Sequence, residues 1–436
     1  MKKALALVLS LAMCASLLVG CGQKDDGSTS TGEAGSVYYL NFKPEAEAAW
    51  QDLAKTYTAE TGVEVKVVTA ASGDYNNTLT AEMAKSDAPT LFQCGNAQSL
   101  LDWGDYCLDL TGSKVLGEMT TSDFNLVEDG AVKAIGYCYE AFGIIVNKEL
   151  LKTAGYELTD ITDFASLKKI AEDIHARADQ LGFDAFASSG LDGSSSWRFS
   201  GHLANMPLYY EFRDDNVTAQ PATITGAYLE NYRNIWDLYI NNSAASKTSL
   251  TTATGDESQA EFGTGKAVFW QQGTWEYANL IGEKYNMKSE DLQMIPIYCG
   301  VEGEAKAALC CGTENCWAVN AEAPEADQKA TLDFLKWVVT SESGTKMMAE
   351  QFGPIPFKAA KEPANVFFAD ANKLIADGNY TVTWAFNHTP NVDAWREGVV
   401  SALTAYSADQ TDANWDAVKT AFVDGWANQY KIQHGL

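Results

Sequence analysis

Segments typical of strands alternate with segments typical of helices over the first part of the chain body. Residues 36–42 (SVYYLNF), 63–70 (VEVKVVTA) and 89–94 (PTLFQC) are rich in β-branched and aromatic side chains and predict strands. Residues 44–62 and 75–87 lie between them and carry apolar side chains at helical spacing. This alternation predicts an α/β lobe with a mostly parallel sheet.

Ligands of such sheets bind beyond the carboxyl ends of the strands. Asn41 and Lys43 follow the first predicted strand, and both are candidates for ligand contact at that edge. Residues 72–73 and 95–96 follow the next two strands and are expected on the same rim.

The later part of the chain is richer in helical patterns. Amphipathic segments at 163–182, 224–241, 325–353 and 414–432 predict helices. A chain of 436 residues is longer than one compact core usually serves. The length therefore predicts two lobes.

The stretch AVFWQQGTWEYANL (267–280) places four aromatic rings around one glycine. Its apolar start predicts a buried strand, and Gly273 is expected to let the chain turn sharply before a helix. Trp270 ends the strand, where core and cleft are equally compatible, and Gln271 is a candidate polar contact. Trp275 falls in the first turn of the helix, where its ring is either packing or a stacking surface.

Residues 1–20 are typical of an export signal, because two lysines precede an apolar stretch that is too short to span a membrane. The end of this segment, LLVGC, is similar to a bacterial lipobox, in which the cysteine is lipidated and becomes the mature N-terminus. That residue is Cys21. The alternative is a plain secretory signal in which Cys21 happens to lie near the cleavage site. Residues 21–36 are rich in Gly, Ser, Thr and charge, which predicts a flexible tether.

Charge and motifs limit the function. The net charge of −27 repels nucleic acid phosphates and anionic lipid headgroups, so neither is an expected partner. The chain has no GxSxG, P-loop or HExxH motif, and its four histidines show no metal-ligand spacing. A glycosidase needs two carboxylates at a set separation, and no pair stands out among 58 acidic residues. We therefore expect neither an enzyme nor a bound cofactor or metal.

The cysteines predict little covalent cross-linking. Cys14 falls in the predicted signal and Cys21 at its end, and an odd number remains, without CxxC or zinc spacing. We expect buried thiols with at most one or two disulfides among Cys94, Cys107, Cys138, Cys299, Cys310, Cys311 and Cys316.

Five segments in order give the chain a specific resemblance. Together they resemble the extracellular solute-binding proteins of bacterial ABC importers, in the large family (family 1) that binds sugars and oligosaccharides. Val146 stands where that family often has tyrosine. The five segments are 141–157, 163–174, 260–280, 341–358 and 391–422.

The resemblance implies a fold and its boundaries. Members of the family have two α/β lobes joined by chain crossings, of the type II periplasmic-binding-protein-like fold, with the ligand in the cleft between the lobes. Lobe one is then expected over 37–141 and 311–354, and lobe two over 142–310 and 355–436.

A sugar cleft needs aromatic faces and hydrogen-bonding groups, and tryptophan offers area, rigidity and one N–H donor. Five tryptophans lie at helical spacing with apolar neighbours and are expected in the core: Trp50, Trp236, Trp337, Trp415 and Trp426. The other seven remain candidates for the cleft: Trp103, Trp197, Trp270, Trp275, Trp317, Trp384 and Trp395.

Several candidates follow from the resemblance. Trp275 matches a tryptophan position that faces the ligand, and Trp395 matches a C-terminal position that commonly stacks on it. Glu140 matches a position that often hydrogen-bonds sugar hydroxyls, with Tyr139 beside it. Its alternative is a solvated surface carboxylate. The return crossing, which exposes polar groups to the cleft in the family, contains Glu314 and Asn315.

Other candidates rest on their surroundings in the sequence. Trp197 lies in the loop GLDGSSSWRFSG, which is too polar for a core segment. Trp103 either faces the cleft or caps the helix formed by AQSLLDW. Trp384 and Asn387 lie in the loop that precedes the C-terminal helices.

The sequence and the resemblance together predict a lipid-anchored, extracytoplasmic binding protein that acts as a monomer. It would capture a carbohydrate, with several aromatic rings favouring an oligosaccharide, and deliver it to the membrane subunits of an ABC permease by hinge closure. Two alternatives stay open. One is the same fold binding a peptide or polyamine, and the other is a surface glycosidase or lyase.

Overall fold

A computed structural model describes residues 35–188 and 190–436. The predicted export signal, Cys21 and nearly all of the predicted tether lie outside the described residues. Within the described part, no helix combines the length and the apolar character that crossing a bilayer requires.

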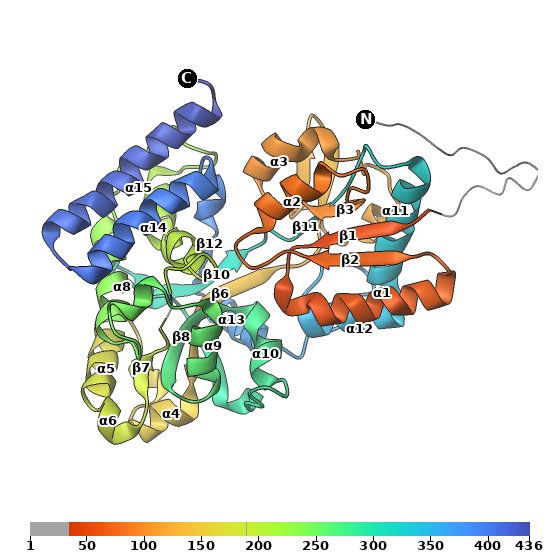
Figure 1. Ribbon diagram of the computed structural model, residues 1–436. Helices are drawn as coiled ribbons and strands as arrows, with labels where there is room; N and C mark the ends of the chain where they lie inside the picture. Colours follow the sequence, from red (N-terminus) through yellow and green to blue (C-terminus); the bar gives the residue numbers. More distant parts are fainter. Residues whose placement is uncertain (1–34, 189) are drawn as a thin grey trace, which may run out of the picture. The chain divides into compact units, whose positions relative to one another are not determined.

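Six strands form the first sheet (Figure 1). Their order is β2 (Val65–Thr69), β1 (Val37–Asn41), β3 (Leu91–Gln93), β11 (Cys316–Val319), β5 (Ala131–Gly136) and β4 (Leu126–Glu128). All five residues of β1 are buried, because strands lie on both of its edges and helices cover both faces of the sheet.

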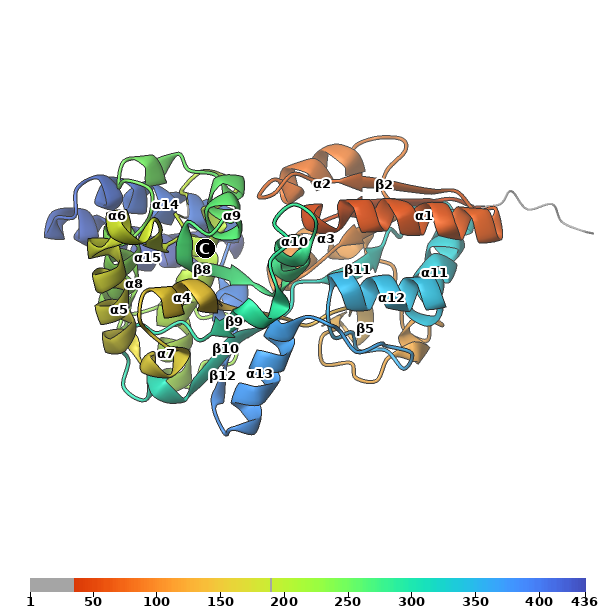
Figure 2. The same ribbon diagram turned by 90° about the horizontal axis from the view of Figure 1, so that it is seen from below.

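Two groups of helices cover this sheet. The longer helices pack on one face (Figure 2): α1 (Glu47–Thr61), α11 (Glu325–Thr340) and α12 (Glu342–Gln351). The short helices α2 (Tyr75–Met83) and α3 (Ala97–Trp103) pack on the other face. As predicted, α1 ends at Gly62, whose positive φ of 75° places it in the left-handed region.

The expectation of a mostly parallel first sheet is wrong. The three N-terminal strands β1, β2 and β3 are parallel, as the alternation with helices requires. The pairs β3–β11, β11–β5 and β5–β4 are antiparallel. The reason is that β11 returns from the second sheet in the opposite direction, and that β4 and β5 form a hairpin. The sheet as a whole is therefore mixed.

The second sheet has the order β12 (Tyr380–Thr383), β10 (Ala307–Gly312), β6 (Glu140–Asn147), β8 (Ala267–Gly273) and β7 (Asp184–Phe186). A further strand, β9 (Leu292–Ile295), also pairs with β6. The central strands β6 and β8 are buried along their whole length. For β8 the apolar start of 267–280 predicted this burial.

Helices cover both faces of the second sheet. One face carries α9 (Gly255–Gly263), α10 (Tyr277–Ile281) and α13 (Val366–Ala376). Helix α13 packs against β9 and β10 (Figure 2). The larger core on the other face includes α4 (Lys148–Thr153), α5 (Phe164–Ala176), α7 (Asn205–Asp215) and α8 (Leu229–Asn241). The C-terminal pair α14 (Val392–Ala408) and α15 (Asp412–Gln433) packs together and completes this core (Figure 1).

Three chain crossings connect the elements of the two sheets, and they are hydrogen-bonded to one another. The amide of Tyr137 donates to the carbonyl of Asn315 at 2.9 Å, and the amide of Tyr139 donates to the carbonyl of Pro354 at 3.2 Å. The described residues, 35–188 and 190–436, belong to one compact unit. The residue limits expected for the two lobes stay a prediction.

The cores contain four of the five tryptophans that helical spacing assigns to them, namely Trp50, Trp236, Trp415 and Trp426. The prediction for Trp337 is confirmed only in part, because the side chain packs against the core without being enclosed by it. This side chain is only half-buried at the edge of α11, where it packs against Tyr57 and donates to Glu60 at 2.9 Å. The seven cysteines of the described residues are all free and buried, which is within the range predicted for them.

Candidate functional site

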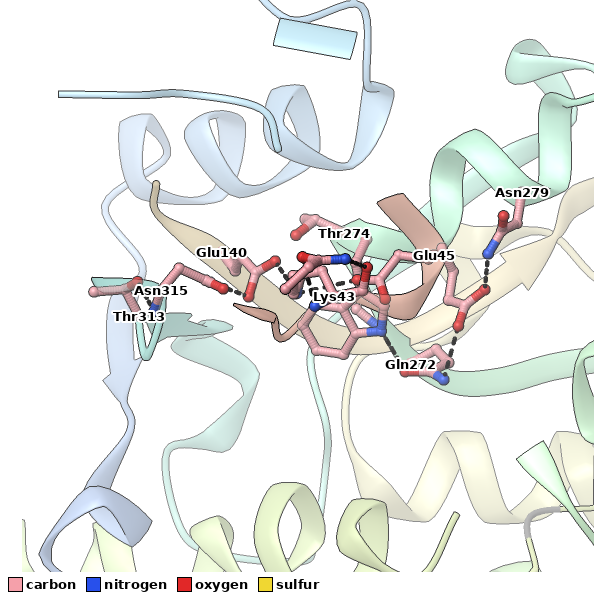
Figure 3. Close-up of polar contacts among 12 residues, drawn as sticks. Lys43, Glu45, Glu140, Gln272, Thr274, Asn279, Thr313 and Asn315 are labelled. Carbon is pink, nitrogen blue, oxygen red and sulfur yellow. Dashed lines mark hydrogen bonds and ion pairs between the residues drawn. The ribbon is translucent and has the colours of Figure 1, made fainter. Parts of the chain in front are cut away.

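A buried ion pair stands at the carboxyl end of β1. The ammonium of Lys43 lies 2.7 Å from Glu140 Oε1 and 3.2 Å from Glu45 Oε1. The other oxygen of Glu140 accepts a hydrogen bond of 2.7 Å from the side-chain amide of Asn315. Lys43 and Glu140 are only 6% and 4% exposed. Figure 3 shows Glu140 between Lys43 and Asn315, so the pair joins β1, β6 and the return crossing.

Local hydrogen bonds direct Lys43 toward this site. Asn41 ends β1, and its side chain both accepts from the amide of Lys43 at 3.0 Å and donates to the carbonyl of Lys43 at 2.7 Å. Asn41 also donates to Thr69 at the end of the neighbouring strand β2. Polar residues at the ends of parallel strands thus meet at one edge, as the sequence predicts.

The carboxylates next to Lys43 stabilise its charged form. Burial alone would lower the pKa of Lys43, but the carboxylates of Glu140 and Glu45 outweigh it and raise this pKa above its ordinary value. Lys43 is therefore protonated at neutral pH. Its ammonium also lies 5.0 Å from the centre of the Trp275 ring, within the range of a cation–π contact.

Trp275 follows β8 in a short 3₁₀ turn, Thr274–Glu276, and is 9% exposed. The expectation that Gly273 lets the chain turn sharply before a helix is wrong. Its φ of −119° and ψ of 179° are extended and make no sharp turn. A Cβ at this position would instead lie 2.2 Å from the Trp275 ring. The glycine is needed because the indole packs directly on the backbone.

Aromatic rings from β6 and from residues 197–202 lie around Trp275. The Trp197 ring lies 6.2 Å away and the His202 ring 5.3 Å away, and His202 stacks on Phe142 at 4.0 Å. His202 contacts Gln271, whose amide lies 3.2 Å from His202 Nδ1. Burial, together with the charges of Arg198, Arg396 and Lys43, lowers the pKa of His202 well below its usual value. The ring is therefore neutral at physiological pH.

A second polar group lies along the return crossing. Asn96, at the start of α3, donates to Glu314 Oε1 at 2.9 Å. Burial raises the pKa of Glu314, while the charge of Arg396 and the amide of Asn96 counteract this shift. Asn387 donates to the carbonyl of Thr313 at 3.4 Å.

The predicted candidates divide into two groups. The structure brings together Asn41, Lys43, Glu140, Trp197, Gln271, Trp275 and Asn315 through the contacts described above. Glu314 and Asn387 adjoin this group only along the return crossing, Glu314 as the chain neighbour of Asn315 and Asn387 through the carbonyl of Thr313. Trp384 lies beside them, with its ring against Gly312 and 5.5 Å from Phe142.

Five predicted candidates lie away from this group. Trp317 on β11 is fully buried in the core of the first sheet, where it stacks on Tyr137 at 4.1 Å. Trp395 is 1% exposed and packs in the core, where it donates to the carbonyl of Phe422. Trp270 is fully buried and stacks on Phe262 on the opposite face of the sheet. Trp103 packs against Tyr106. Tyr139 points away from the Glu140 side and packs against Phe124, because neighbouring residues of an extended segment face opposite directions.

Sequence reasoning missed several side chains of this region: Glu45, Phe142, His202, Gln272, Glu276 and Arg396. Gln272 and Glu276 lie inside the aromatic stretch 267–280, so their position was available from the sequence. His202 and Arg396 come from segments whose local patterns gave no signal. Only the fold brings them to the Trp275 ring and to Glu314.

Contacts also link the rim of the first sheet to the elements around the second. Ser72 donates to the carbonyl of Ser194 at 3.3 Å, and Asn76 on α2 donates to Asp393 on α14 at 2.6 Å. The carbonyl of Ser194 also accepts from the indole of Trp197. The first of these contacts therefore reaches the backbone that holds a candidate stacking ring.

The arrangement suits recognition of a neutral polar molecule. It offers aromatic faces next to carboxylate, amide and ammonium groups whose charges are largely matched. Among the described residues, no group of three or more His, Cys, Asp or Glu side chains could hold a metal ion.

Comparison with known proteins matches residues 52–376 to the model of a family described as bacterial extracellular solute-binding protein. No curated protein matches the chain. Many solved structures share its fold.

Three of these structures illustrate the likeness. The solute-binding protein RafE in complex with raffinose is 15% identical over 91% of this chain and 99% of its own, with a TM-score of 0.71. A chitin oligosaccharide binding protein is 16% identical over 92% and 98% of the two chains, with a TM-score of 0.68. The GacH receptor of Streptomyces glaucescens, solved unliganded and with acarbose, is 18% identical over 92% and 99%, with a TM-score of 0.66. At these identities the likeness concerns the fold.

Proposed function

The chain belongs to the bacterial extracellular solute-binding proteins, and from this premise we propose that it captures a carbohydrate outside the cytoplasm for an ABC importer. The observation that carries the proposal is the Trp275 ring, which lies beside Trp197 and directly next to the Lys43–Glu140–Asn315 network. A sugar presents a C–H face to an aromatic ring and hydroxyl groups to polar side chains at its edge.

The roles of the residues follow from their chemistry. Trp275 and Trp197 would stack on the sugar faces. Glu140 and Asn315 would accept and donate hydrogen bonds to hydroxyl groups, and Lys43 would donate. Because Lys43 and Glu140 already neutralise each other, the site carries little net charge from this pair, which favours a neutral solute.

Binding would proceed by a hinge motion without covalent chemistry. In the structure Lys43 lies over the Trp275 ring, so a sugar that stacks there must displace it. Separation of the contacts Ser72–Ser194 and Asn76–Asp393 would open the way, and closure over the sugar would form them again. The closed, liganded form is then the one that the permease recognises.

A ligand screen tests the proposal. We expect raffinose, chitin oligosaccharides, acarbose or galactose, the sugars bound by structural relatives, to stabilise the protein in a thermal shift experiment. A sugar at 100 times its Kd adds about 2.7 kcal/mol to the free energy of unfolding. Stabilisation by peptides or polyamines alone would contradict the carbohydrate proposal. Chromatography of the incubated sugar would reveal an enzyme by the products it forms.

We further propose that Cys21 carries the lipid that anchors the protein to the outer face of the cytoplasmic membrane. The proposal rests on the lipobox-like LLVGC and the Gly/Ser/Thr-rich segment that follows. Cys21→Ser is expected to release the protein from the membrane fraction or to leave the signal uncleaved. The measurement is fractionation with an immunoblot, with Cys14→Ser as the matched control. A Cys21→Ser protein that is still processed and membrane-bound would exclude the anchor.

A further inference from the structure

Glu276 is buried next to Trp275 and has only amide partners. It is 8% exposed and accepts hydrogen bonds from Gln272 at 3.2 Å, Gln259 at 2.9 Å and Asn279 at 3.1 Å. Burial raises the pKa of its carboxyl, and the amides of Asn279 and Gln259 counteract this shift. Figure 3 shows two of these partners, Gln272 and Asn279, with their hydrogen bonds as dashed lines.

Neighbouring donors fix the direction of the hydrogen bonds that Gln259 and Gln272 form with Glu276. Gln259 Oε1 accepts from Lys284 at 3.2 Å and from Tyr285 at 3.1 Å, so its NH₂ group must face Glu276. An amide has one accepting and one donating end. Glu276 is therefore the common acceptor, and all three amides turn their NH₂ groups toward it.

Gln272 transmits this orientation to Trp275. Since its NH₂ group faces Glu276, its oxygen faces the other way and accepts from the indole Nε1 at 3.1 Å and from the amide of Gly273 at 3.2 Å. The ring also packs on the Gly273 backbone, where no Cβ would fit. The hydrogen bond from Nε1, at one edge of the indole, and the Gly273 backbone against its face thus define the plane of the ring.

We propose that Glu276 is the positioning residue for the Trp275 ring, which it holds through the amide of Gln272. Because the only indole donor is bound inside the protein, Trp275 offers a ligand its ring face and no hydrogen bond. The site then selects sugars with an uninterrupted C–H face at this position. This inference rests on the proposed function for its ligand, but the orientation of the ring can be tested without any ligand.

Glu276→Gln is the sharpest test, since it keeps the shape and replaces one acceptor oxygen by a donor. The new NH₂ group must face either Gln272 or the pair Gln259 and Asn279, and donor against donor is unfavourable. Gln272 is expected to flip, which would place its NH₂ group against the Trp275 indole. In ligand-free protein labelled with ¹⁵N-tryptophan, the Trp275 indole N–H resonance, assigned by its absence in Trp275→Phe, should move upfield.

Two further variants complete the test. Gln272→Leu removes the acceptor itself and should move the same resonance, even if Glu276→Gln folds poorly. Asn279→Ala removes one donor, leaves Gln259 on the same oxygen, and should leave the resonance in place. For the sugar that stabilises the wild type most among raffinose, chitotriose and galactose, titration calorimetry should show about 10-fold weaker binding in the first two variants.

The outcomes separate this inference from the proposed function. An unchanged Trp275 resonance in both Glu276→Gln and Gln272→Leu would overturn the positioning role, whatever the proteins bind. A moved resonance with unchanged sugar affinity would overturn the claim that ring orientation serves recognition. If none of the sugars binds the wild type, the proposed function fails, while the resonance still decides whether Glu276 orients the ring.

Discussion

Replacing Trp275 by alanine is expected to weaken sugar binding by about 30- to 1000-fold. Truncation of a buried aromatic anchor in an interface typically costs about 2–4 kcal/mol, and each 1.4 kcal/mol is a factor of ten in Kd. The ring lies next to Trp197 and to the Lys43–Glu140 pair. If it stacks on the sugar as proposed, its loss removes that aromatic face beside the polar groups. Titration calorimetry with the best sugar of the screen measures the effect.

The matched control is Trp270→Ala, five residues earlier in the same segment. Trp270 is fully buried and stacks on Phe262, on the face of β8 away from the candidate site. Its truncation should lower the free energy of unfolding by about 3–5 kcal/mol and leave the sugar affinity of the folded protein unchanged. Trp275→Ala should cost less stability, because its ring lies at the edge of the core. Normal binding combined with the larger loss of stability would show that Trp275 is packing.

The second large effect is expected for Glu140→Gln. This change keeps the volume of the side chain but leaves the Lys43 ammonium, which is 6% exposed, without its closest counter-charge. Removing one partner of a buried ion pair typically costs about 3–5 kcal/mol. We expect the lower end, about 3 kcal/mol, because Glu45 remains 3.2 Å from the ammonium. Urea unfolding of ligand-free protein, followed by fluorescence, measures the change.

Two comparisons test the physical cause. The double variant Lys43→Met with Glu140→Leu removes both charges and should recover most of the lost stability, since replacing a whole buried pair by apolar side chains is often neutral. Asp333→Asn breaks the exposed pair with Lys329 and should leave the unfolding midpoint unchanged. If Glu140→Gln unfolds at the same urea concentration as the wild type, the pair does not stabilise the fold.

Both variants concern residues that the sequence analysis singled out, Trp275 partly from its local pattern and Glu140 from the resemblance to a family. The end of a strand and the start of a helix are readable from periodicity. The pattern of neighbouring residues alone therefore placed Asn41 and Lys43 at the end of a strand and Trp275 in the first turn of a helix. The same holds for the burial of β8 and for the end of α1 at Gly62. Glu140, Asn315 and the ligand-facing role of Trp275 came from the resemblance of whole segments to a family.

Only the tertiary structure decided what these residues touch. Trp395 and Trp197 both looked eligible, yet helix packing buries the first against Phe422 while a short polar loop holds the second beside Trp275. Gly273 proved to serve the close approach of an indole.

The sequence by itself determined the elements, their alternation and the polar rim, because these depend on propensities and periods within one segment. The mixed character of the first sheet, the partners of Lys43 and the contact of His202 with Trp275 depend on segments far apart in the chain. These contacts depend on the path of the chain between the two sheets, because that path decides which distant segments become neighbours. The pattern of residues within one segment does not contain this information.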